Sequence, residues 1–170
     1  MKNIMKMVLV AALTLTVSMA SAQKSGRINV QSLIMGMPET TKMQTDLETI
    51  RKDYAANLET MQVELNNKYV EFQQSQATMT ESIRAMKQKE IQDLGTRMEQ
   101  FEANAMQEIQ AKQQELLQPI IEKARAAVAA EAKAGSYTVV YDESAGGLAY
   151  FDESTVVDLT APVKVRLGIK

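Results

Sequence analysis

The feature of this sequence that most constrains its fold is a long segment with almost no helix-breaking residues. Between Pro38 and Gly135 only Gly95 and Pro119 interrupt it, while every other Gly and Pro lies outside this segment. Gly and Pro are the strongest local breakers of regular structure. Residues 39–133 are therefore predicted to be helical, and the chain is predicted to be mostly α.

Apolar residues recur three or four positions apart in two stretches of this segment, as expected for one face of a helix. The first stripe runs from Met43 to Phe72 and the second from Ile83 to Leu116, with a polar gap at residues 73–80. In that gap, Thr78 followed by Glu81 matches a capping box, which starts a new helix. The pattern predicts a long antiparallel helical hairpin, similar to a coiled coil, with its turn near residues 74–80. A single unbroken helix remains the alternative, because no Gly or Pro marks the turn.

Short alternating segments on both sides of the helical region indicate strands. They are residues 27–31, residues 137–141 and residues 148–151, of which the last two are predicted to form a hairpin across Gly146 and Gly147. Asp158 to Thr160 is predicted to cap a last short helix. Three short strands are too few for independent stability. We therefore expect strands of identical subunits to complete an oligomeric β core.

These patterns predict three parts of the chain. Residues 1–22 form a signal peptide, residues 23–38 and 134–170 form a discontinuous β body, and residues 39–133 form a helical arm that projects from it. The signal peptide is indicated by Lys2 and Lys6, an apolar run up to Ala20, and a small-residue cleavage site ending at Ala22. An uncleaved membrane anchor is the alternative, although the run is shorter than the roughly 20 residues that span a bilayer.

The composition excludes several classes of function. The chain has no His and no Cys, so it has no residues for a His general base, a Cys nucleophile or a Cys/His zinc site. Only 5% of its residues are aromatic, which argues against a substantial aromatic ligand pocket. Its formal net charge of −2 does not favour nucleic acid as a partner. Most common enzyme designs are therefore excluded, and we expect no enzyme activity and no metal site.

The order and spacing of these elements resemble the Skp/OmpH family of periplasmic chaperones over nearly the whole exported chain. No single motif is specific, but ordinary coiled coils do not carry strands at both ends. The matching segments are residues 28–30, Met37-Pro38-Glu39, Pro119-Ile120-Ile121, residues 126–130, residues 139–142 and Asp158-Leu159-Thr160.

The resemblance implies a homotrimer whose small β body carries three helical hairpins. It also implies an ATP-independent holdase in the periplasm of a Gram-negative bacterium, which keeps unfolded outer-membrane proteins in a cavity between the arms without any cofactor. The alternative is a structural spacer or tether of the cell envelope, which needs no binding surface. The charge departs from strongly basic family members, because residues 39–133 contain 12 basic and 16 acidic residues. Lipopolysaccharide binding is therefore not carried over.

Three groups of residues are candidates for function. A thread of small apolar residues lies opposite the main stripe at seven-residue spacing, and together with Met106 it is the predicted cavity lining; its members are Ala56, Val63, Val70 and Ala77. The alternative is an ordinary scatter of small apolar residues on the surface. Pro119 removes a backbone donor and is predicted to be either a hinge or a fixed bend. A basic cluster after the turn, Arg84, Lys87 and Lys89, could touch membrane head groups or a client, or form a solvated helix face.

Overall fold

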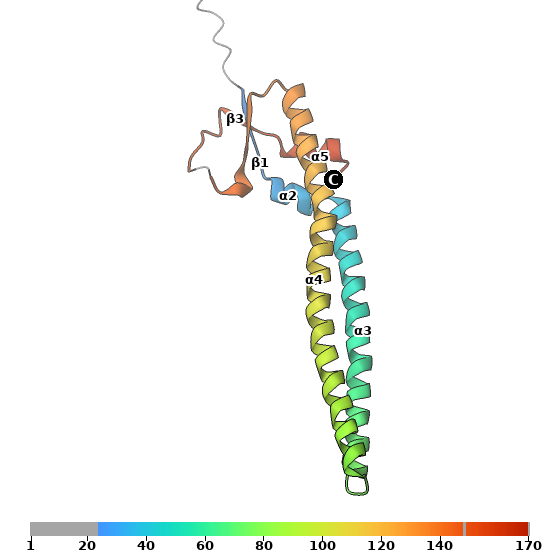
Figure 1. Ribbon diagram of the computed structural model, residues 1–170. Coiled ribbons are helices and arrows are strands. Elements are labelled where there is room, and N and C mark those ends of the chain that lie inside the picture. Colours follow the sequence, from blue (N-terminus) through green and yellow to red (C-terminus); the bar gives the residue numbers. More distant parts are fainter. Residues whose placement is uncertain (1–23, 148, 170) are drawn as a thin grey trace, which may run out of the picture. The chain divides into compact units, whose positions relative to one another are not determined.

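The computed structural model describes residues 24–147 and 149–169, and these residues are mostly helical with a small three-stranded sheet (Figure 1). The expected signal peptide and its cleavage site after Ala22 lie outside the described residues. The elements follow in the order β1 (Ser25–Ile28), α2 (Val30–Met35), α3 (Pro38–Ser75), α4 (Glu81–Ala134), β2 (Val139–Asp142), the short 3-10 helix η2 (Glu143–Ala145), β3 (Val156–Asp158) and α5 (Thr160–Leu167).

The described residues form two compact units. One contains the described residues up to Val30 together with Ala126–Gly168, and the other contains Gln31–Arg125 and Ile169. The first is called the sheet unit below. The second is called the helix pair, because it consists of α2, α3 and most of α4.

The sheet unit has the strand order β2-β1-β3, and both pairings are parallel. Ser25 is opposite Val139 on one side and Val156 on the other. The predicted hairpin is therefore wrong: residues 149–151 are irregular, and the third strand is β3. The predicted first strand lies slightly earlier than expected, because α2 begins at Val30.

Side-chain hydrogen bonds after β2 explain why the hairpin does not form. The Asp142 carboxylate accepts hydrogen bonds from the backbone N–H and the hydroxyl of Ser144, which turn the chain into η2. Gly146 then ends η2 with a φ of 68°, a left-handed conformation that glycine adopts without strain. Asp152 accepts the same pair of hydrogen bonds from Ser154 before β3 begins. Two Asx turns thus take the chain away from β2 before it returns in parallel.

The core of the sheet unit lies where β1 meets α5. Ile28, Leu159 and Val163 are all at most 1% exposed. A Cβ added to Gly26 would lie 2.8 Å from Leu159 Cδ1, so a larger residue there would push the buried Leu159 side chain aside. The Arg27 guanidinium of β1 forms ion pairs with Glu143, which follows β2, and with Asp158 of β3. It also lies over the ring of Phe151.

In the helix pair, α3 and α4 run side by side in opposite directions (Figure 1). Most residues of the two predicted stripes are buried or half-buried, which confirms the helical periodicity; the exceptions are Tyr69, Ile83 and Met86. Tyr54 contacts the Phe101 ring edge-on at 5.6 Å between centroids and donates a hydrogen bond to Glu108. The seam between the helices therefore contains the stripe residues, as the spacing predicted.

In the turn between the helices, the residue that caps α4 is not the predicted one. Helix α3 ends at Ser75 and α4 begins at Glu81, so the chain is not a single unbroken helix. The residue that caps α4 is Thr80, whose hydroxyl accepts a hydrogen bond from Ile83 N–H at 3.4 Å, and not Thr78. The Thr78 hydroxyl instead donates to the Ser75 carbonyl and helps to close the end of α3.

Ion pairs connect the two helices along their length. Glu39 pairs with Lys123, Lys68 Nζ lies 3.6 Å from Glu90, and Lys87 Nζ lies 3.2 Å from Glu71. Each pair joins one helix to the other, so a shift in register would break all three. No helix within the described residues is long and apolar enough to cross a membrane.

Candidate functional site

The predicted cavity thread lies on the surface of α3. Val63 is 54% exposed and Val70 is 42% exposed, and Ala56 and Ala77 are also exposed. Seven residues are close to two helical turns, so the four side chains share one face. Exposure of two valines at this spacing shows that the helix pair does not need them for its own packing.

Toward its C-terminal end, this face of α3 carries few charges. Between Thr60 and Ala77 the only charged residues are Glu64, Lys68 and Glu71. All three take part in ion pairs on the flank that faces Lys87 and Glu90 of α4. One helical turn away from Val70, the neighbours are the uncharged Asn66, Asn67, Gln73 and Gln74, which lowers the cost of covering this end of the thread with another apolar surface. At the other end, Glu59 lies one turn from both Ala56 and Val63.

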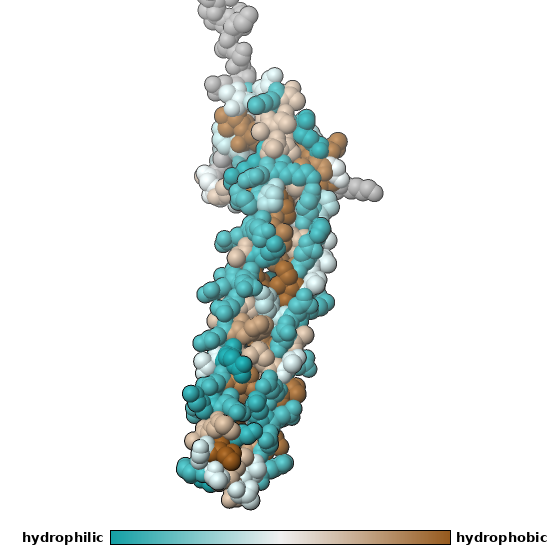
Figure 2. Space-filling model, turned by 45° about the vertical axis from the view of Figure 1, so that its right-hand side comes forward, coloured by the Kyte–Doolittle hydropathy of each residue, from teal (hydrophilic) through white to brown (hydrophobic). Residues whose placement is uncertain are grey.

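Met106 lies on α4 and is 60% exposed. It belongs to the stretch of α4 that faces Tyr54, because Tyr54 contacts both Phe101 and Glu108. This level of the pair corresponds to the Ala56 end of the thread. Tyr69, Ile83 and Met86 were predicted as stripe residues but are 51%, 43% and 52% exposed, so they add apolar surface nearer the turn. Figure 2 shows apolar patches between hydrophilic side chains along the helix pair.

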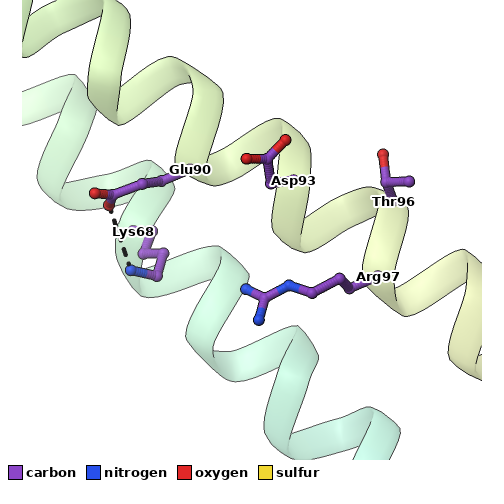
Figure 3. Close-up of a pocket in the computed structure, with 5 residues that line it drawn as sticks. All are labelled: Lys68, Glu90, Asp93, Thr96 and Arg97. Atoms are coloured by element: carbon purple, nitrogen blue, oxygen red, sulfur yellow. Dashed lines mark ion pairs between the residues drawn. The ribbon is translucent and has the colours of Figure 1, made fainter.

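Two shallow hollows open along the seam at the level of residues 62–69, and they differ in charge. The first, about 470 Å³, is lined by one α3 residue and four α4 residues: Lys68, Glu90, Asp93, Thr96 and Arg97. Figure 3 shows the Lys68–Glu90 ion pair crossing between the helices, with Arg97 directed toward α3. We call it the charged hollow.

The second hollow, about 370 Å³, has no charged residue in its lining, and we call it the neutral hollow. It is lined by Gln62, Leu65, Asn66, Tyr69, Ile91 and Gly95. Lys68 and Tyr69 are adjacent in the chain, and a helix turns about 100° per residue. The two hollows therefore open on different sides of the helix pair.

Pro119 lies inside α4, which continues as a helix through it. It lines a third hollow of about 270 Å³, together with Met43, Leu116 and Ile120 and a charged rim that includes the Glu39–Lys123 ion pair. That ion pair lowers the pKa of Glu39, chiefly through the hydrogen bond from Lys123. Pro119 itself is exposed, and the choice between a hinge and a fixed bend stays a prediction.

Two members of the basic cluster have partners within the helix pair. Arg84 donates to the Gln76 carbonyl at 3.1 Å and pairs with Glu81, so it closes the turn. Lys87 pairs with Glu71. Lys89 is exposed on α4. A contact with lipid head groups would compete with the pairs of Arg84 and Lys87, and it stays a prediction.

The helix pair therefore presents chemistry for reversible apolar contact. Within residues 24–147 and 149–169, no three Asp or Glu residues are placed to hold a metal ion. The Tyr54 pKa is raised by its hydrogen bond to Glu108, which keeps the phenol protonated as a donor.

The neutral hollow was not predicted from the sequence, because Gly95 was interpreted only as a helix breaker. The signal that could have found it was a glycine inside the second apolar stripe, where no turn was needed.

Comparisons with known proteins agree with this architecture. The family model described as "Outer membrane protein (OmpH-like)" matches residues 24–167. A "Chaperone protein Skp" from Pectobacterium atrosepticum is 30% identical over 154 residues, covering 89% of each chain. A protein of the same name from Yersinia enterocolitica is 32% identical over 148 residues, covering 84% of each chain.

One solved structure has a similar fold. It is a putative outer membrane chaperone (OmpH-like) from Caulobacter crescentus, with a TM-score of 0.75 and 14% identity over 86% of this chain and 85% of the other. At 14% identity this similarity shows a shared fold only. The family model and the two relatives show which family the chain belongs to. The chain belongs to the OmpH-like outer membrane protein family, which includes the Skp chaperones.

Proposed function

We propose that the protein is an ATP-independent holdase chaperone of the Gram-negative periplasm, which binds unfolded outer-membrane proteins and prevents their aggregation. The observation that carries this proposal is the exposed apolar thread of α3, because its valines are unnecessary for closing the helix pair. The names of the two relatives, both "Chaperone protein Skp", support the same role.

The assembly we propose is a homotrimer in which α3 and α4 form a helical arm and the sheet units form a shared body. Three arms would then enclose a cavity lined by Ala56, Val63, Val70, Ala77 and Met106. Unfolded clients differ in sequence and must be released, so weak and adaptable contacts suit them. Methionine and small aliphatic side chains supply such contacts because they repack at little cost.

A spacer or tether of the cell envelope is the competing function. A spacer needs buried seams but no exposed apolar thread, and it would keep its role when that thread is made polar. The two functions therefore differ in what the thread contributes.

The test is replacement of Val63 and Val70 by Lys in the full mature protein. We expect loss of aggregation suppression for an unfolded outer-membrane β-barrel protein, with unchanged helical circular dichroism, because each covered Val contributes about 1–2 kcal/mol. The matched control is Gln107→Lys with Gln114→Lys, which adds the same charge at the same spacing on exposed positions of α4. A Val variant that still protects the client as well as the parent would remove the thread from the binding surface. Equal losses in both variants would show that added charge is the cause.

A further inference from the structure

The neutral hollow is open beside residue 95, which has no side chain. A Cβ built on Gly95 would meet no atom within 4 Å, so neither close packing nor a turn requires a glycine at this position. Gly95 lies well inside α4, where glycine is unfavourable compared with alanine. The glycine therefore lowers helix stability without any packing gain, and it leaves its side of the hollow open.

The lining of the hollow is suited to a flat apolar group. Leu65 and Ile91 in its lining are half-buried, and Tyr69 is 51% exposed. The Tyr69 hydroxyl accepts a hydrogen bond from Gln73 at 2.8 Å, which holds the ring in place. Aromatic rings pair favourably in offset or edge-to-face arrangements. A ring entering beside Gly95 would meet a positioned aromatic partner.

The two hollows beside the seam differ in charge, and the neutral hollow disfavours a charged side chain. The neutral hollow has no charged residue in its lining, whereas the charged hollow at the same level is formed almost entirely by Lys68, Glu90, Asp93 and Arg97. At the rim of the neutral hollow, Gln62 and Asn66 carry amides that can both donate and accept hydrogen bonds. Such amides suit the backbone of an extended chain whose side chain occupies the hollow.

We propose that the neutral hollow is a subsite for an aromatic side chain of an unfolded client, held in an extended segment without charges. This inference rests on the holdase function proposed above and names the client chemistry that the function would select. Transmembrane β-barrel strands carry such residues, because aromatic girdles flank their apolar band. The subsite repeats in every copy of the chain, so each arm binds one aromatic residue.

The test compares two substitutions on α4 in the full mature protein. Gly95→Leu fills the hollow, and Thr96→Leu places the same side chain in the neighbouring charged hollow as a control. Two labelled probes of one unfolded outer-membrane β-barrel protein are used: the native sequence, and a version whose aromatic residues are replaced by Leu. Dissociation constants are measured by fluorescence anisotropy at equal salt.

We expect Gly95→Leu to weaken binding of the aromatic probe by about tenfold, which corresponds to about 1.4 kcal/mol. Thr96→Leu should leave both dissociation constants unchanged, and the parent should bind the aromatic probe more tightly than the Leu version. Gly95→Ala should give a smaller loss together with a higher unfolding midpoint, which separates the subsite from damage to the fold.

Different failures have different meanings. If the parent binds both probes and Gly95→Leu binds them equally well, the subsite is wrong while the holdase function stands. If the parent binds neither probe, the holdase function itself is wrong. If Gly95→Leu changes the sedimentation mass, the hollow is an interface between copies of the chain, and the client subsite is overturned.

Discussion

At the scale of single residues, exposure separates the positions that hold the helix pair together from those that face outward. Leu94 and Val63 are both aliphatic residues on long helices, yet Leu94 is 1% exposed and Val63 is 54% exposed. Leu94 belongs to the α4 stripe in the seam, and Val63 belongs to the thread. The same chemistry therefore stabilises the fold at one position and is available to a partner at the other.

Truncation at these two positions should have very different effects on stability. We expect Leu94→Ala to lower the free energy of unfolding by about 2–5 kcal/mol, because it leaves a cavity between the helices. Val63→Ala, the matched control, should change it by less than about 0.5 kcal/mol, as is usual for exposed positions. Urea unfolding followed by circular dichroism measures both values. Similar losses for the two variants would contradict the assignment of Leu94 to the seam.

At the scale of elements, polar side chains lie at the starts of α4 and α5, whereas α3 begins at Pro38 without a side-chain cap. Thr80 caps α4 through Ile83, and the Asp158 carboxylate accepts the Thr160 N–H at 2.8 Å at the start of α5. The pKa of Asp158 is lowered, first by the Thr160 side-chain hydrogen bond, then by the Thr160 backbone, with the charge of Arg27 as a smaller cause. The charged carboxylate therefore stabilises the junction of β3 and α5.

A lowered carboxyl pKa makes stability depend on pH with a definite sign. The stabilisation by Asp158 is fully present above the ordinary Asp pKa of about 3.9, and it is lost as the pH falls through the lower value in the fold. We expect Asp158→Asn to be less stable than the parent at pH 7, with a smaller further loss on acidification to pH 3.

Thermal unfolding at a series of pH values between 7 and 3 checks this prediction. Asp53→Asn, which changes an exposed carboxylate in the middle of α3, serves as the control. If the unfolding temperatures of Asp158→Asn and the parent fall by the same amount between pH 7 and pH 3, the stabilisation by Asp158 does not depend on its charge.

At the scale of the whole molecule, the sheet unit leaves two strand edges available. Within the described residues, β2 and β3 are each hydrogen-bonded to β1 only. Val139, Tyr141 and Val157 on these strands are 41%, 37% and 44% exposed. Unpaired edges with apolar residues favour association with other strands. The homotrimer proposed above would cover them.

Sedimentation equilibrium of the mature protein should therefore give the mass of three chains. Val139→Lys combined with Val157→Lys should raise the dissociation constant of the assembly, because charged side chains lose hydration when an interface covers them. Tyr150→Lys, at a position that is 84% exposed, is the control and should leave the mass unchanged. A stable monomer at micromolar concentration for the parent would contradict the trimer, and a dimer would contradict the shared three-part body.

Much of the helix pair could be predicted from the sequence because helical periodicity is a local signal. Each stripe repeats over many turns, so single exceptions such as Tyr69 and Met86 did not obscure it. The last short helix was also predicted, since Asp158 and Pro162 mark its start within a few residues. In all these cases the informative residues are neighbours along the chain.

The tertiary structure alone decided which strands pair and where the seam is neutral. Strands of three or four residues carry little pattern, and Ser25 of β1 pairs with Val139 across the whole helical region, so the parallel order is invisible locally. The capping choice between Thr78 and Thr80 likewise depends on how the end of α3 closes. The neutral hollow arises because α4 places Gly95 beside Leu65 and Tyr69 of α3. Such a juxtaposition depends on the packing register of two helices, which contacts along the whole pair determine together.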